Sequence, residues 1–168
     1  GNGRLGRILV PLFLYEKKLL SRPIFYLSGY FEEHKDEYIS TLRAIGKEDG
    51  AWNQWIRFFL SALVEQSGAN ADKARSIMAL YKELKTRVLD LTRSIYAVPL
   101  LDKIFERPVF SGTHIRFPDG AQPSRVSVAN LLRTLLGAGI LKVIREGRGQ
   151  RAQILALQEL IDICEGKK

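Results

Sequence analysis

The spacing of apolar side chains predicts that residues 1–96 are almost entirely helical. Residues 5–20 are apolar on nearly every side of a helical projection, which predicts a buried helix kinked at Pro11. A second helical stretch, capped by Ser21, is expected to run to the loop at residues 46–50. Two residues are candidate breaks in that stretch, Gly29 and His34.

Aromatic and aliphatic residues then recur at helical spacing from residue 52 to residue 66. Gly68 is expected to end this helix, and Asn70 to cap another one. The apolar positions of that last helix alternate steps of four and three, which is typical of a seam packed against other helices. These positions are Ile77, Tyr81, Leu84, Val88, Leu91 and Ile95.

The pattern changes near Pro99. The expected elements are a short helix, a loop, a longer helix, two strands and a closing helix, at residues 100–106, 108–122, 124–136, 140–145, 151–156 and 157–164. In the longer helix the side chains expected to face inward are Val126, Ala129, Leu132, Leu135 and Leu136. We therefore predict a mainly α protein, with a helical domain at residues 1–96 and a small α+β domain at residues 97–168.

The composition favours a globular protein over a membrane-spanning or disulfide-rich one. Hydrophobic residues make up 46% and charged residues 26%, which is typical of a globular chain. No stretch of the sequence is long and apolar enough to span a bilayer, so we expect no membrane association. A single cysteine, Cys164, excludes an internal disulfide and a multi-cysteine metal site, and it favours a cytoplasmic protein.

The net charge of +8 is concentrated locally. Residues 116–151 hold seven basic side chains and only two acidic ones, Asp119 and Glu146, so this stretch carries +5. A local excess of this kind can contact phosphates, whereas a scattered excess only aids solubility. The basic residues are Arg116, Arg125, Arg133, Lys142, Arg145, Arg148 and Arg151.

The first seven residues are a candidate phosphate-binding motif. Gly1, Asn2 and Gly3 precede a helix, where backbone N–H groups can point toward an anion. Arg4 and Arg7 lie three residues apart, so both can face that anion once helical. Gly-Asn-Gly also occurs as an ordinary turn, and the residues alone leave both interpretations open.

Residues 1–7 match the second half of the Fic motif, His-x-Phe-x-(Asp/Glu)-Gly-Asn-Gly-Arg-x-x-Arg. Four later segments, in the same order, also resemble this family: Ile8 to Lys17, Tyr26 to Glu32, Asp36 to Tyr38 and Trp52 to Phe59. The similarity covers about the first 95 residues. It implies a Fic-type helical bundle truncated at its N-terminus, and a chain that begins inside the motif.

The resemblance implies that the intact protein is an enzyme, which transfers AMP from ATP to a hydroxyl side chain of a target protein. Gly1, Asn2 and Gly3 would form the anion hole, and Arg4 and Arg7 would pair with the outer phosphates. Tyr38 is a candidate for the adenine pocket, although a tyrosine on an apolar helix is more often a core residue.

The motif histidine, the general base, and the acid that holds Mg²⁺ on ATP would both precede Gly1. Neither His34 nor His114 is placed to substitute for that histidine, since His34 lies among charged residues and His114 in a different module. We expect this chain alone to be inactive, with no metal ligands of its own and no tightly bound cofactor.

The order of elements in residues 97–168 is typical of a winged helix-turn-helix, which places a helix in the DNA major groove and a hairpin along the backbone. Candidate contacts lie on that helix and hairpin: Ser124, Arg125, Ser127, Asn130, Arg133, Lys142, Arg145, Arg148 and Arg151. A loop at residues 113–121 replaces the usual short helix before the recognition helix. The alternative function is a regulatory module that forms homodimers or binds other proteins.

Overall fold

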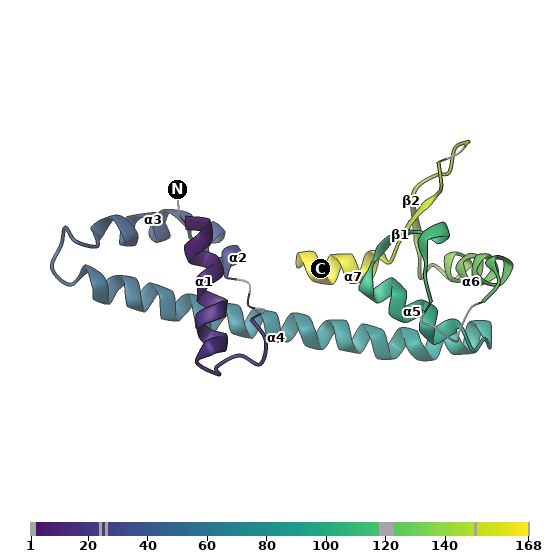
Figure 1. Ribbon diagram of the computed structural model, residues 1–168, viewed down its shortest axis with the longest axis horizontal. Coiled ribbons are helices and arrows are strands. Elements are labelled where there is room, and N and C mark those ends of the chain that lie inside the picture. Colours follow the sequence, from purple (N-terminus) through teal and green to yellow (C-terminus); the bar gives the residue numbers. More distant parts are fainter. Residues whose placement is uncertain (1–2, 24, 26, 118–122, 150, 168) are drawn as a thin grey trace. The chain divides into compact units, whose positions relative to one another are not determined.

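The computed structural model describes residues 3–23, 25, 27–117, 123–149 and 151–167, including their side chains except those of Arg4 and His114 (Figure 1). The protein is mainly helical, as the sequence predicts, with one small sheet. It forms two compact units, unit 1 (Gly1–Asp72) and unit 2 (Lys73–Lys168). In the part of the chain that the structure describes, no helix is long and apolar enough to cross a membrane.

Unit 1 contains three short helices and the first part of a long one, α1 (Gly3–Glu16), α2 (Ser28–Glu33), α3 (Lys35–Ala44) and α4 (Ala51–Thr92). The break expected near Gly29 or His34 falls at His34, which separates α2 from α3. The predicted helix start at Ser21 is wrong, because residues 21–23 form bends. Pro23 disfavours helical geometry at the residue before it, which delays the helix.

α1 runs through Pro11, but the prediction of a buried helix is wrong. Of its apolar side chains, Val10 packs against the core of unit 1. A helix that is apolar all round can bury only the sides that meet other elements, so its remaining faces stay in solvent within unit 1. The exposed side chains are Leu5, Ile8, Leu9, Leu12, Phe13 and Tyr15.

α4 is a continuous helix of 42 residues, so the predicted end at Gly68 and the cap at Asn70 are wrong. A glycine inside a helix costs about 1 kcal/mol relative to alanine, which good helix formers on either side can offset. The side-chain amide of Gln66 also donates a hydrogen bond of 3.0 Å to Oδ1 of Asn70, bridging the turn that contains the glycine. Asn70, which the sequence predicts as a helix cap, therefore forms a side-chain hydrogen bond inside α4 instead.

Unit 2 follows with five elements of helix and three strands. They are α5 (Ala97–Glu106), β1 (Val109–Ser111), the 3₁₀ turn η1 (Gly112–His114), α6 (Arg125–Gly137), β2 (Lys142–Arg145), β3 (Ile154–Ala156) and α7 (Gln158–Glu165), together with the second part of α4. The strands form an antiparallel sheet in the order β1-β3-β2. The predicted domain boundary at residues 96 and 97 coincides with the start of α5 and lies inside this unit.

The core of unit 2 contains side chains from α4, α5, β1, α6, β3 and α7. Its most deeply buried side chains are Leu84, Val88, Leu100, Leu101, Ile104, Leu135, Leu141 and Leu157. The prediction for α6 holds for Leu132 and Leu135, which are buried, but Val126 is 69% exposed and Ala129 is also exposed. Both wrong positions lie near the N-terminal end of α6, where the helix leaves the core.

Two cations from α4 secure the ends of other helices in unit 2. Nζ of Lys73 donates to the carbonyl oxygen of Cys164 at 2.6 Å, and a guanidinium N–H of Arg87 donates to that of Ala138 at 2.9 Å. The last carbonyls of a helix lack intrahelical partners and carry partial negative charge, so a cation there is favourable. These contacts hold α6 and α7 against the second part of α4.

A polar contact also joins α4 to α5. The hydroxyl of Tyr81 donates a hydrogen bond of 2.6 Å to the Asp102 carboxylate, and the Tyr81 ring meets that of Phe105 edge-on at 5.1 Å. The hydrogen bond to Asp102, together with burial and the carboxylate charge, raises the pKa of Tyr81 above 10.0. The neutral phenol is therefore the form that the fold stabilises.

Replacing Tyr81 by Phe is expected to lower the free energy of unfolding by about 1 kcal/mol near neutral pH, because it leaves Asp102 without its donor. Since the folded pKa lies above the unfolded value of 10.0, this contribution is complete below that value and is lost as pH rises through the folded pKa. Urea denaturation of both proteins at neutral and at strongly alkaline pH checks this. A stability difference that does not shrink at alkaline pH would contradict the assignment.

Candidate nucleotide and nucleic-acid sites

The candidate phosphate-binding motif lies at the N-terminal end of α1. Gly1 and Asn2, and the side chain of Arg4, lie outside the described part of the structure. Gly3 is the first residue of α1 and has open space around it, since a Cβ placed there would meet no described atom within 4 Å. Arg7 lies one turn further along the helix and is half-buried. α1 has no acidic residue in its first turn, so the positive end of the helix dipole is not neutralised there.

Tyr38, the candidate for an adenine pocket, packs within the aromatic cluster of unit 1. Its ring stacks on Phe31 with centroids 4.8 Å apart, and it lies 5.8 Å from Trp55 and 6.2 Å from Phe58. The side chain is half-buried. Packing of this kind is what a core tyrosine shows, and it assigns Tyr38 a structural role in unit 1.

Of the two histidines, the structure describes the side chain of His34 only. His34 stacks on Tyr30 with ring centroids 4.0 Å apart, and its Nδ1 lies 3.1 Å from the Tyr30 carbonyl oxygen. It therefore packs at the break between α2 and α3. The side chain of His114 lies outside the described residues. Among the described side chains, no group of three His, Cys, Asp or Glu could hold a metal ion.

In unit 2 the N-terminal end of α6 carries several of the predicted nucleic-acid contacts. The Ser124 hydroxyl is the N-cap and accepts a hydrogen bond of 3.1 Å from the backbone N–H of Ser127. Arg125 is exposed in the first turn. Asn130 and Arg133 are also exposed, and a guanidinium N–H of Arg133 donates to the Asn130 amide oxygen at 2.9 Å. Ser124 therefore acts as a helix cap, whereas Arg125, Asn130 and Arg133 present polar groups to solvent.

The hairpin of β2 and β3 carries the remaining candidates and extends beyond the helices of unit 2 (Figure 1). Lys142 and Arg145 lie on β2, whose side chains are all exposed. Arg148 and Arg151 face each other across the turn, where each backbone N–H donates to the other's carbonyl, at 3.0 and 2.9 Å. Both side chains are exposed. The hairpin therefore presents a row of cations to solvent.

Glycine is required at the base of this turn. A Cβ on Gly147 would lie 3.2 Å from the Arg151 carbonyl oxygen and 3.3 Å from the Gln153 backbone nitrogen. Gly149 has a φ of +56°, in the left-handed region that favours glycine. These two residues let the strands approach closely, which sets Arg148 against Arg151.

Two grooves on unit 2 bring arginines together from different segments. The first, about 880 Å³, is lined by Arg145 together with Arg107 and Arg116. The second, about 990 Å³, is lined by Arg125, Arg133 and Arg116. Sequence reasoning did not select Arg107, which lies between α5 and β1, outside the basic stretch of residues 116–151. Only its position beside the sheet brings it near the other arginines.

No family model matches this chain.

Proposed function

We propose that this chain is the C-terminal part of a Fic-type protein adenylyltransferase, which transfers AMP from ATP to a hydroxyl side chain of a target protein. The observation that carries the proposal is the match of residues 1–7 to the second half of the motif, immediately before and within the start of α1. A glycine turn at a helix N-terminus suits a phosphate, because N–H groups and the helix dipole both favour negative charge.

In this proposal the chain supplies the phosphate-binding half of the active site. Gly1, Asn2 and Gly3 hold the transferred phosphate, while Arg4 and Arg7 pair with the outer phosphates. Mg²⁺ would accompany ATP, and its acidic ligand belongs to the first half of the motif. The described part of α1 supports the phosphate-binding role with helix N–H groups and the guanidinium of Arg7.

The exposed apolar faces of unit 1 support membership in a larger helical bundle. Besides α1, the first part of α4 exposes a row of residues four apart, with Trp52 61%, Ile56 48%, Leu60 52% and Val64 72% accessible. An apolar stripe at this spacing lies along one side of a helix and is typical of a face that packs against another helix. The remaining helices of a Fic-type bundle would cover such a stripe.

Label transfer tests the proposal. The longer protein that carries a His-x-Phe-x-(Asp/Glu) sequence before Gly1 is incubated with Mg²⁺ and ATP labelled at the α-phosphate, together with candidate targets or a cell extract. We expect the label to become covalently attached to protein hydroxyls, and the isolated chain of 168 residues to transfer none. Absence of transfer and of self-labelling by the longer protein would overturn the proposal.

We propose, as a second function on the same polypeptide, that residues 97–168 bind nucleic acid as a winged helix. The order α5, β1, η1, α6, β2, β3, with the sheet order β1-β3-β2, supports this assignment. The exposed arginines of the hairpin and of α6 are placed on elements that contact phosphates in such modules. η1 and the segment after it stand where a short helix is usual.

The double change Arg148→Ala and Arg151→Ala is expected to weaken duplex DNA binding about tenfold and to lower the salt-dependence slope by about two, because two phosphate contacts are lost. Fluorescence anisotropy over a range of salt concentrations measures both. The double change Arg43→Ala and Arg57→Ala removes the same charge from exposed positions in unit 1 and serves as the control. Equal effects of the two pairs, or self-association that is insensitive to salt, would favour the dimerising alternative.

A further inference from the structure

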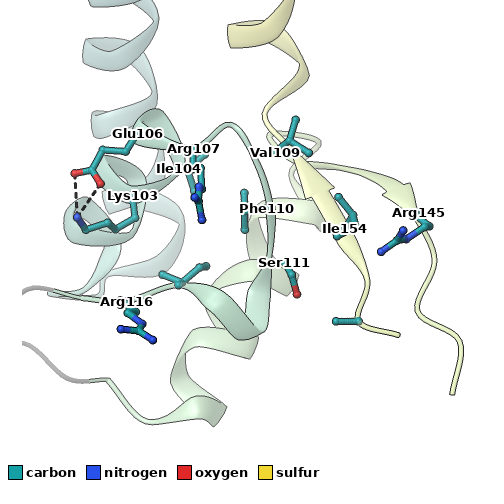
Figure 2. A pocket seen from close by; sticks show the side chains of 12 residues that line it. Lys103, Ile104, Glu106, Arg107, Val109, Phe110, Ser111, Arg116, Arg145 and Ile154 are labelled. Atoms are coloured by element: carbon teal, nitrogen blue, oxygen red, sulfur yellow. Dashed lines mark hydrogen bonds and ion pairs between the residues drawn. The ribbon is translucent and has the colours of Figure 1, made fainter. Parts of the chain in front are cut away.

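The groove of about 880 Å³ on unit 2 lies where α5, the sheet and the segment after η1 meet (Figure 2). Its surface combines apolar side chains with cations. Ile104, Val109, Phe110 and Ile154 contribute the apolar part, and three elements contribute one arginine each.

Three guanidinium groups give the groove its charge. Arg107 follows α5, Arg116 follows η1, and Arg145 lies on β2. Among the described residues that line the groove, the one acidic side chain is Glu106, and Nζ of Lys103 holds it at 2.8 and 2.9 Å, as the dashed lines in Figure 2 show. Within this described lining, the ion pair leaves the three arginines without an opposing carboxylate. The groove is therefore complementary to an anionic ligand.

The groove also contains the free edge of β1. In the described part of the chain, β1 is an outer strand of the sheet and pairs only with β3. The backbone N–H of Leu157 donates to the Pro108 carbonyl oxygen at 2.9 Å, which makes these two residues a hydrogen-bonded pair. Since such pairs alternate along an antiparallel ladder, Val109 and Ser111 occupy the positions between them.

At those intermediate positions the backbone groups point away from β3. The N–H and C=O of Val109 and the N–H of Ser111 therefore face the outer edge of β1, toward the groove. No backbone hydrogen bond from outside the sheet reaches Val109 or Ser111 among the described residues. The Val109 side chain is 46% exposed beside this edge. An unpaired edge of this kind is a template for another strand.

We propose that this groove binds an extended peptide of a partner protein, one that alternates acidic and apolar residues and pairs with the free edge of β1. Main-chain hydrogen bonds to the exposed Val109 hold the peptide, as in strand addition. Its carboxylates pair with Arg107 and Arg116, and its apolar side chains pack on Val109 and Ile154.

The groove favours a peptide over a nucleic acid for two physical reasons. An extended peptide satisfies the outward N–H and C=O of Val109 with its own backbone, whereas a phosphodiester offers acceptors only. Val109 and Ile154 also place aliphatic surface between the arginines, where a peptide side chain is dehydrated favourably. Nucleic acid binding at the hairpin and α6 would use other residues, apart from Arg145.

Fluorescence anisotropy tests the proposal with the full chain and a fluorescein-labelled octapeptide that alternates glutamate and valine. We expect saturable binding, and the double change Arg107→Glu and Arg116→Glu should weaken it about tenfold or more. The matched double change Arg43→Glu and Arg57→Glu, at exposed arginines of unit 1, should alter it less than about twofold. Far-UV circular dichroism verifies that the variants are folded.

Two modified peptides separate strand addition from attraction between charges. Each carries N-methyl groups at alternate residues, in one peptide on the residues that face β1 and in the other on those that face away. Only one of the two should retain binding, because methylation removes the N–H donors on a single edge. Equal binding of both modified peptides would overturn the proposal, and so would no binding of the parent peptide. It would also be overturned if the Arg107→Glu and Arg116→Glu change weakened the binding of a single-stranded oligonucleotide but not that of the peptide.

Discussion

If the proposed function holds, replacing Arg7 by alanine in a protein with His-x-Phe-x-(Asp/Glu) before Gly1 is expected to lower the rate of AMP transfer by a factor of about 100 or more. On the proposed function, Arg7 pairs with the terminal phosphate of ATP and orients the nucleotide for attack on its α-phosphate. A guanidinium that pairs with phosphate in a partly buried site gives a charge-assisted bidentate contact, and loss of one such electrostatic group costs about 100-fold to 1000-fold in rate. Arg7 is half-buried on α1, where solvent screens it less than a surface arginine.

Arg22→Ala is the matched control, because this exposed arginine follows the opposite end of α1. Transfer of label from ATP labelled at the α-phosphate gives the rate, and the retained helical signal in circular dichroism excludes unfolding. The conservative variant Arg7→Lys keeps the charge without the bidentate geometry, so it should recover only part of the activity. Equal rates for the Arg7→Ala and Arg22→Ala proteins would show that Arg7 does not contact the nucleotide.

Replacing Leu84 by alanine is expected to lower the stability of unit 2 by about 3 kcal/mol. Leu84 is 1% exposed and lies on the second part of α4, in the same core as Leu100, Ile104 and Leu135. Removal of its three outer carbons loses apolar burial and leaves a cavity, because neighbouring helices close only part of the space. The size of this effect follows from the nearly complete burial of Leu84 in the core of unit 2.

Hydrogen exchange of amides in α5 and α6 reports on unit 2, whereas both tryptophans, Trp52 and Trp55, lie in unit 1. A loss of about 3 kcal/mol corresponds to exchange about 150-fold faster for amides that open with the whole unit. Leu89→Ala, on the same helix but 39% exposed, should change exchange far less. If the two variants behave alike, the second part of α4 does not contribute to this core.

Much of the helical structure could be predicted from the sequence, because its signals are local. The helix predicted at residues 124–136 corresponds to α6, and Ser124 caps it by bonding an N–H group only three residues away. The loop at residues 46–50 and the break at His34 were likewise found. The hairpin arginines are neighbours along the chain, so their clustering needed no tertiary information.

Other features of the sequence were misleading because a local signal has more than one structural use. Gly68 and Asn70 have the composition of a helix end, yet they lie inside α4. An all-round apolar helix predicts burial, yet the extent of burial depends on which elements surround it, and most of α1 is exposed. In both cases the free energy depends on neighbours that the pattern does not identify.

By itself, the sequence determined the helical class, the hairpin and the motif at α1, since each depends on residues a few positions apart. The tertiary structure alone decided the strand β1, which forms only by pairing with β3, far along the chain. It also decided the groove, where Arg107, Arg116 and Arg145 come together from separate elements. The physical reason is that pairing of distant segments depends on the closure of long loops and on shared burial, which no local spacing of residues records.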